Sequence, residues 1–227
     1  EADHGACPYL PDRRWVTRSF QLSPMPCAAY ESMLADGWRR SGSVFYQNHC
    51  PGCTCCVPLR ISVQSFRPSR SQRRTLRRNT DVSVVTGRPS SEREVIDLYR
   101  RYVQARHDPY DPADLEQYEQ FLVLSPVDTQ MMRYTVGERL VGIGWVDLLP
   151  DGISSVYFAF EPNEGRRSLG TFSVIQEIAY ARQLGKEWLY LGFFVPGSSK
   201  MEYKGRFSPN QVAVDGAWTD DHGRIPC

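Results

Sequence analysis

The sequence predicts an α+β protein in two parts, a small cysteine-bearing N-terminal domain over residues 1–80 and a second domain over residues 90–227. From residue 130 onward, strand-like segments alternate with turns and one long helix-like segment, which predicts a mixed, mostly antiparallel sheet. Before residue 80, Cys, Pro and Arg are frequent and strand-like runs are short. Hydrophobic residues make up 41% of the 227 residues, which excludes general disorder.

The first part contains short predicted elements. They are strands at 43–47 and 57–63 and a helix at 27–36. A second helix is expected to begin after Ser69, because Ser69 followed three residues later by Gln72 is a capping-box signature. The stretch Gly87-Arg-Pro-Ser-Ser then marks the boundary between the two parts.

The second part begins with helices and continues as a sheet. The expected helices are 92–104, 117–124 and 169–184, and the expected strands are 131–136, 140–148, 153–160, 188–195 and 211–218. Gly137 lies in the hairpin turn between the first two strands, and Gly185 ends the long helix.

Positive charge is concentrated in one segment. The whole chain has 27 Lys and Arg against 26 Asp and Glu, but residues 38–80 contain nine arginines and no acidic residue. Such a patch on a nearly neutral protein builds a directed field, and the usual polyanion drawn to it is nucleic acid.

The arginines after Ser69 share one side of the predicted helix. At about 100° per residue, that side carries Arg70, Arg73, Arg74, Arg77 and Arg78. Guanidinium groups bind phosphate in a fork and stack on bases, so the stripe suits an RNA backbone. The alternative is a solvated helix face that pairs with acids elsewhere, for instance Asp108, Asp111, Asp114, Glu116 and Glu119.

A phosphate-binding turn is predicted where the long helix begins. Arg167 and Gly170 form an Arg-x-x-Gly turn after a strand, and a helix N-terminus offers unpaired N–H groups and a positive dipole end. The turn resembles the Arg/Gln-x-x-Gly-x-Gly/Ala pattern of acyl-CoA N-acyltransferases, except that Phe172 replaces a small residue. The alternative is an ordinary helix start. Tyr203 and Lys204 are expected near this cleft, where either could orient a carbonyl or protonate a leaving oxygen, although a surface loop is the simpler interpretation.

The seven cysteines and the hydropathy pattern bear on location. An odd number of cysteines without a secretory signal predicts free thiols or metal ligands rather than a disulfide framework. No apolar run approaches the roughly 18 residues of a membrane span, and no signal-peptide apolar region is present at the start. A cytoplasmic location and no membrane partner are therefore expected.

Motifs in both parts occur in a recognisable order over about residues 7–218. They are Cys7-Pro-Tyr-Leu-Pro, Gly37-Trp-Arg-Arg-Ser-Gly42, Cys50-x-x-Cys53-x-x-Cys56, Ser69-Arg-Ser-Gln-Arg-Arg74, Asp147-Leu-Leu-Pro-Asp-Gly152, Arg167-Ser-Leu-Gly170, Tyr190-Leu-Gly192 and Lys200-Met-x-Tyr203-Lys204. Together they resemble the aminoacyl-tRNA–protein transferase family, specifically its short bacterial branch.

The resemblance implies a cysteine-bearing N-terminal domain followed by an acetyltransferase-like (GNAT) domain. It implies transfer of an amino acid from charged tRNA to the N-terminus of a protein in the N-degron pathway. In the bacterial branch the donor is typically leucyl-tRNA and the acceptor an N-terminal Asp or Glu. The longer eukaryotic relatives use arginyl-tRNA, which leaves an arginyl donor as an alternative.

Site residues follow from these motifs. The expected tRNA-binding residues are Arg70, Arg73, Arg74, Arg77, Arg167 and Gly170, and the expected catalytic residues are Tyr203 and Lys204. An acidic acceptor needs a positively charged binding site. Candidates for it are Arg39, Arg40 and Arg60, which lie in the segment 38–80 without acidic residues. Cys7, Cys50, Cys53 and Cys56 have spacings compatible with Zn²⁺ or an iron–sulfur cluster, the alternative being reduced structural thiols. No cofactor is expected to be required.

Two rival functions explain half of the chain each. An acyl-CoA-dependent N-acetyltransferase would account for residues 130–200 but would leave the arginine stripe and the cysteines without a role. A non-catalytic RNA-binding module held by a metal would account for residues 37–80 only.

Overall fold

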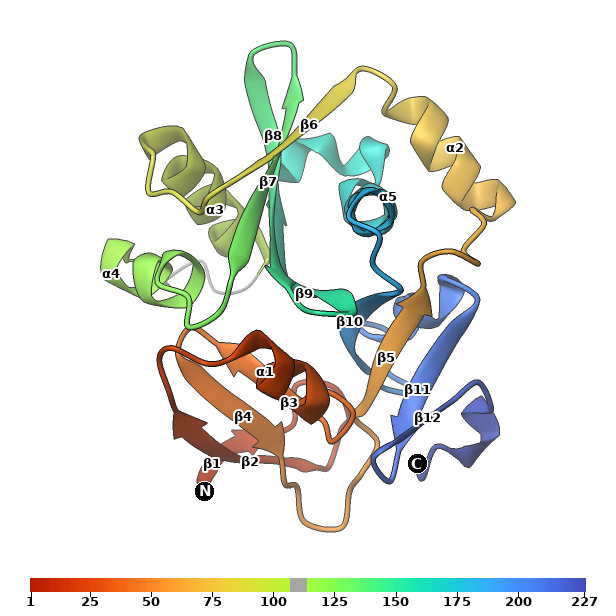
Figure 1. Cartoon of the computed structure of the whole chain (residues 1–227). Helices are drawn as coiled ribbons and strands as arrows, with labels where there is room; N and C mark the ends of the chain where they lie inside the picture. Colours follow the sequence, from red (N-terminus) through yellow and green to blue (C-terminus); the bar gives the residue numbers. More distant parts are fainter. Residues whose placement is uncertain (107–113) are drawn as a thin grey trace.

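The computed structural model describes residues 1–106 and 114–227 and confirms the α+β class (Figure 1). The chain begins with a four-stranded antiparallel sheet. Its strands are β1 (Ala2–Ala6), β2 (Arg14–Gln21), β3 (Trp38–Ser41) and β4 (Val44–Asn48), in the spatial order β1-β2-β4-β3. Helix α1 (Cys27–Met33) covers this sheet, because Tyr30 of α1 packs edge-on against Phe45 of β4.

The larger sheet has eight strands. They are β5 (Val57–Ser62), β6 (Val82–Gly87), β7 (Thr129–Val136), β8 (Arg139–Leu148), β9 (Gly152–Phe160), β10 (Trp188–Phe194), β11 (Asn210–Val214) and β12 (Ala217–Thr219). Their order is β12-β11-β5-β10-β9-β8-β7-β6. Within the described chain β9 and β10 pair in parallel and the other neighbours pair antiparallel, so the predicted mixed, mostly antiparallel sheet is confirmed.

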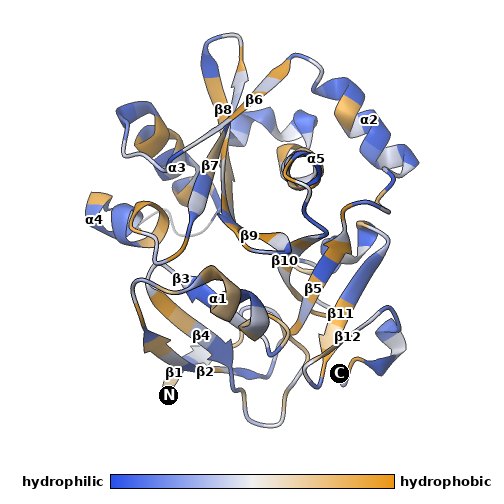
Figure 2. Ribbon diagram, in the orientation of Figure 1, coloured by the Kyte–Doolittle hydropathy of each residue, from blue (hydrophilic) through white to orange (hydrophobic). Residues whose placement is uncertain are grey.

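Helices cover both faces of the larger sheet. They are α2 (Arg70–Arg78), α3 (Arg93–Arg106), α4 (Leu115–Tyr118) and α5 (Leu169–Gln183). Neighbouring side chains on a strand point to opposite faces. Met132 of β7 accordingly packs in the core beneath α5, whereas Met131 packs with α3 on the other face. In Figure 2, α2 is mostly hydrophilic, as expected of a helix with one side exposed.

Several elements differ from the sequence expectations. β1, β2, β3 and β6 were not expected, and the predicted helix 117–124 is α4 followed by a π-helical turn at Glu119–Val123. The expected strand 211–218 is instead the hairpin β11–β12. Asp215 and Gly216 form its turn with positive φ angles of 51° and 74°, a conformation that Asp-Gly pairs adopt readily.

The larger sheet draws on both ends of the sequence. β5, from the cysteine- and arginine-rich region, lies between β10 and β11. Both sheets therefore contain residues from the first 80 positions, and the division into domains 1–80 and 90–227 stays a prediction. None of the described helices combines the length and apolarity that crossing a membrane requires.

Candidate active site

A cavity of about 470 Å³, here called the central cavity, lies between the two sheets. The smaller sheet contributes wall residues from β3 and β4, and the larger part contributes residues from β9, α5 and β10. Lys204, Tyr203 and Met201 close another side. The fold thus brings side chains from segments far apart in the sequence to one concave site, the usual setting for substrate binding.

Lys204 is a buried amine in this cavity. The residue is only 9% exposed, and its Nζ donates a hydrogen bond to the Phe193 carbonyl at 3.0 Å. Burial, with a smaller contribution from the nearby Arg39 cation, lowers the pKa of Lys204 from 10.5 to about 7. An amine with this pKa exchanges protons readily near neutral pH.

Tyr203 lies where the central cavity meets a smaller one. The smaller cavity, of about 270 Å³, is formed around the start of α5 and is here called the helix-start cavity. Tyr203 and Gly170 line both cavities. Desolvation, with nearby Glu177 and Tyr102, raises the pKa of Tyr203 to about 12, so its hydroxyl stays protonated and able to donate.

Gly170 leaves the start of α5 open. A Cβ atom added at Gly170 would meet no atom within 4 Å, so the backbone here faces free space. The preceding Ser168 has φ 56°, and its carbonyl accepts hydrogen bonds from the amides of Thr171 and Phe172 at 3.0 Å. The positive end of the helix dipole therefore faces the helix-start cavity, which favours an anionic group there.

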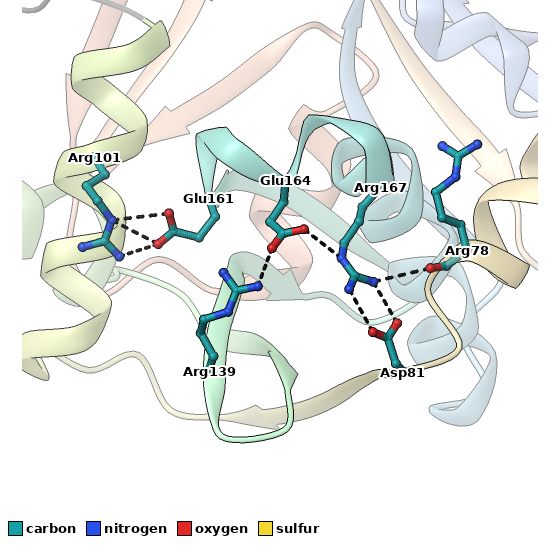
Figure 3. Close-up of polar contacts among 7 residues, drawn as sticks. All are labelled: Arg78, Asp81, Arg101, Arg139, Glu161, Glu164 and Arg167. Atoms are coloured by element: carbon teal, nitrogen blue, oxygen red, sulfur yellow. Dashed lines mark hydrogen bonds and ion pairs between the residues drawn. The ribbon is translucent and has the colours of Figure 1, made fainter.

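Arg167 has a different position from the one expected. Its guanidinium donates to Asp81 at 2.8 and 2.9 Å and to Glu164 at 2.9 Å (Figure 3). Arg139 also bonds Glu164, and Arg101 bonds the neighbouring Glu161. These contacts hold the turn before α5 in place. In the part of the chain that the structure describes, Arg167 lines neither the central cavity nor the helix-start cavity. Its role in tRNA binding stays a prediction that these contacts do not favour.

The arginine stripe lies on the exposed side of α2. The predicted capping box is confirmed: the Ser69 hydroxyl accepts from the Gln72 amide at 3.3 Å, and the Ser69 amide donates to Gln72 Oε1 at 2.8 Å. Arg70, Arg73, Arg74, Arg77 and Arg78 are exposed, whereas Gln72 and Thr75 are buried. Within the described residues, none of these arginines forms an ion pair with a carboxylate. Asp108 and Asp111, proposed as alternative partners, lie outside the described residues.

The stripe ends beside the helix-start cavity. Asn79, which follows α2, donates to the Arg167 carbonyl at 2.9 Å, and Arg78 reaches the Arg166 carbonyl and the Ser168 hydroxyl. Ser168 lines the helix-start cavity. An extended anion bound along α2 would therefore arrive at the start of α5.

The three candidate acceptor arginines are in three different environments. Arg40 pairs with buried Asp147, and Arg60 donates to Gln211 while stacking on the Trp188 ring at 3.6 Å. Arg39 lines the central cavity and is 6% exposed; its Nη1 donates to the Trp38 carbonyl at 2.8 Å, but Nε and Nη2 have no partner among the described residues. Arg39 is the candidate with free hydrogen-bond donors.

Glu177 is a buried residue of this site that the sequence did not indicate. It lies on α5, is 1% exposed, and lines the central cavity. Desolvation raises the pKa of its carboxyl group from 4.5 to about 8. Two adjacent polar residues such as this Gln-Glu pair usually indicate the exposed face of a helix. The burial of Glu177 becomes evident only from the packing of α5 against β9.

The four candidate metal ligands gather in another cavity of about 440 Å³. Burial, with the nearby thiols of Cys50, Cys7 and Cys53, raises the pKa of Cys56 to about 12. Yet across residues 1–106 and 114–227 no three Cys, His, Asp or Glu side chains have an arrangement suited to holding a metal ion. The thiols are chemically suitable but not arranged as ligands, and a metal stays a prediction.

One pair of cysteines forms a disulfide, contrary to expectation. Cys55 bonds Cys227, which ties the loop before β5 to the C-terminal segment. The other five cysteines are free, in agreement with the sequence.

Sequence comparison identifies similar proteins. Two profiles of the arginine-tRNA-protein transferase family match this chain, the N-terminal one over residues 5–74 and the C-terminal one over residues 94–214. A protein named aspartate/glutamate leucyltransferase from Pseudomonas savastanoi pv. phaseolicola is 39% identical over 215 residues, covering 93% of this chain and 92% of the relative. One of the same name from Pseudomonas fluorescens (strain Pf0-1) is 38% identical over 216 residues, covering 94% and 92%.

Structural comparison finds a more distant likeness. The structure of L-PGS from Bacillus licheniformis matches with a TM-score of 0.50 and 11% identity, over 80% of this chain and 55% of the other. At that identity the likeness concerns the fold alone.

Proposed function

The chain belongs to the arginine-tRNA-protein transferase family, and we propose that within it this protein transfers leucine from leucyl-tRNA to proteins that begin with Asp or Glu. The high identity to proteins named aspartate/glutamate leucyltransferase, over nearly the whole of both chains, supports leucine as the donor amino acid. The product would be marked for degradation through the N-degron pathway, and charged tRNA as donor implies work in the cytoplasm.

The two unpaired nitrogen donors of the buried Arg39 guanidinium in the central cavity are the observation that best supports an acidic acceptor. Its Nε and Nη2 have no partner among the described residues, although leaving buried donors unpaired is costly. A carboxylate of an N-terminal Asp or Glu would satisfy both donors in a bidentate contact. Arg40 then acts indirectly, because its bond to Asp147 fixes the strand on which Arg39 lies.

The tRNA is proposed to bind along α2. Arg70, Arg73, Arg74 and Arg77 would contact the phosphate backbone, and the 3′ end would reach the open backbone at Gly170. Because Gly170 and Tyr203 line both cavities, an aminoacyl ester at the helix-start cavity would be adjacent to an acceptor in the central cavity.

The reaction needs positioning more than a strong base. The donor is an activated ester, and an α-amino group titrates near pH 7.7–8.0 in peptides, so part of it is already neutral. The amine nitrogen attacks the ester carbonyl and the ribose oxygen leaves. Tyr203 or Lys204 would stabilise the oxyanion or protonate the leaving oxygen.

A panel of donors and acceptors tests this function. The protein is incubated with radiolabelled leucyl-tRNA or arginyl-tRNA and with peptides that begin with Asp, Glu, Lys or Ala. Leucine should appear on the Asp and Glu peptides. Transfer from arginyl-tRNA alone would assign the arginyl donor, and tRNA binding without transfer would support the non-catalytic alternative.

A further inference from the structure

The central cavity is lined by two buried side chains of opposite charge type that have hydrogen-bonding atoms without partners among the described residues. Arg39 comes from β3 of the smaller sheet and Glu177 from α5 on the larger sheet. Arg39 Nε and Nη2 and both carboxyl oxygens of Glu177 make no hydrogen bond within the described residues. Most buried polar groups are paired, and these two side chains line the same cavity, where one bound ligand could supply partners for both.

The neighbours of Glu177 leave it without a counter-charge. The Ser155 hydroxyl lies close enough to Glu177 to favour the charged form of its carboxyl group, but neither carboxyl oxygen of Glu177 accepts a hydrogen bond from a described residue. Tyr134 and Tyr203 are close enough for the Glu177 charge to raise their pKa values. No described Lys or Arg forms an ion pair with Glu177. With the cavity empty, burial keeps the carboxyl group protonated at neutral pH, and an ammonium group placed beside it would favour ionisation.

The N-terminal residue of an acidic acceptor carries both complementary groups. It has an α-amino group and a side-chain carboxylate within one residue. The leucyl group on tRNA has an α-amino group too, but its carboxyl group is esterified, so it matches only one of the two orphans. The pair therefore fits the acceptor better than the donor.

We propose that Glu177 binds the α-amino group of the acceptor while Arg39 binds the carboxylate of its first side chain. This inference rests on the proposed function, since it places the acceptor of that reaction. It gives a role to the buried carboxyl group in a cavity that is proposed to receive an acidic substrate.

The same contact gives Glu177 a place in the proton transfers. The Glu177 carboxylate takes one proton from the acceptor ammonium, which leaves a neutral amine. The amine nitrogen bonds to the ester carbonyl carbon and the bond from that carbon to the ribose oxygen breaks. Tyr203 or Lys204 protonates the ribose oxygen and regains its proton from the second proton of the nitrogen, and Glu177 later releases its proton to solvent.

Peptide binding without tRNA tests the proposal. One peptide begins with Asp; the other carries a succinyl group in its place, which keeps the side-chain carboxylate and lacks the amine. The wild-type protein should bind the Asp peptide about tenfold or more tightly than the succinyl peptide, the size of a hydrogen bond to a charged group. In Glu177→Gln the two affinities should become equal within about twofold, while the exposed control Glu187→Gln keeps the wild-type preference.

Two further measurements keep the outcomes distinct. Glu177→Asp retains a carboxyl group and should keep part of the preference, which separates the role of the group from an effect on folding. A wild-type protein with no preference, or an unchanged preference in Glu177→Gln, would overturn the proposal. The proposal would also be overturned if the wild type bound leucyl-tRNA more tightly than N-acetyl-leucyl-tRNA and Glu177→Gln lost this difference. Glu177 would then bind the α-amino group of the donor. Absence of leucyl transfer by the wild type would instead contradict the proposed function.

Discussion

Arg40 and Asp147 form a buried ion pair that joins the smaller sheet to the larger one. Arg40 lies on β3 and Asp147 on β8, 107 positions later, and the Arg40 Nε to Asp147 Oδ2 distance is 2.7 Å. The two side chains are 2% and 0% exposed, and the Thr129 hydroxyl completes the network by donating to Asp147 at 2.6 Å. The pair fixes β3 beside the central cavity and thereby positions the adjacent Arg39.

Breaking this pair should destabilise the protein strongly. Arg40→Ala leaves Asp147 buried without a counter-charge, and removal of one partner from a buried pair typically costs about 3–5 kcal/mol. The loss is measured as the free energy of unfolding in urea. Arg14→Ala is the control, because Arg14 pairs with Asp3 at the surface and should change the stability by about 1 kcal/mol or less. Equal effects of the two substitutions would show that the pair does not hold the sheets together.

Replacing Arg73 and Arg74 by Ala should weaken the binding of every tRNA about equally. Each lost phosphate contact reduces the slope of log affinity against log salt by roughly 0.7–0.9. Binding is measured over a series of salt concentrations. Arg93→Ala, which removes a highly exposed arginine of α3, should leave the slope unchanged. If the double variant binds tRNA like the wild type at low salt, the stripe is only a solvated face.

Local patterns in the sequence predicted much of the fold. Ser69 and Gln72 predicted the start of α2 because a capping box involves residues only three positions apart, and Gly137 marked the β7–β8 hairpin for the same reason. The acidic partner of Arg40 could not be predicted, since the two residues meet only after both sheets form. Glu177 was missed because burial of one helix face depends on what packs against it. Arg167 matched a phosphate-binding pattern, but its contacts with Asp81 and Glu164 depend on the position of α2.

Lys204 and Tyr203 should each contribute to the transfer step. Tyr203→Phe should lower the single-turnover rate by about 10²-fold or less, the size of positioned acid–base assistance. The pKa of Lys204 is lowered to about 7, so its ammonium form is lost as the pH rises through that value. If the ammonium protonates the leaving ribose oxygen, the wild-type rate should decline above pH about 7, and Lys204→Met should lack this decline. A Tyr203→Phe, Lys204→Met double variant that reacts at the wild-type rate would remove both residues from the chemistry.

The four cysteines that line one cavity leave two possibilities open, a bound metal or iron–sulfur cluster and reduced structural thiols. Elemental analysis of anaerobically purified protein decides between them. A bound metal requires close to one Zn²⁺ or cluster per chain and should be lost in Cys53→Ser, because metal ligands of this kind must be thiolates. Cys27→Ser is the matched control, since Cys27 is a free thiol on α1 outside the set. A content below about one tenth of a metal per chain would leave the cysteines as structural thiols.

The most direct test is whether Arg39 gives the protein a preference for an acceptor with a negatively charged first side chain. Initial rates of leucyl transfer are compared for two peptides that differ only in an N-terminal Asp or its uncharged isostere Asn, with the wild type and with Arg39→Met. The wild type should favour Asp by about 10²-fold, as expected for a buried, charge-assisted contact, and Arg39→Met should lose nearly all of that preference. Equal rates for Asp and Asn in the wild type, or an undiminished preference in Arg39→Met, would contradict a charge-reading acceptor site in the central cavity.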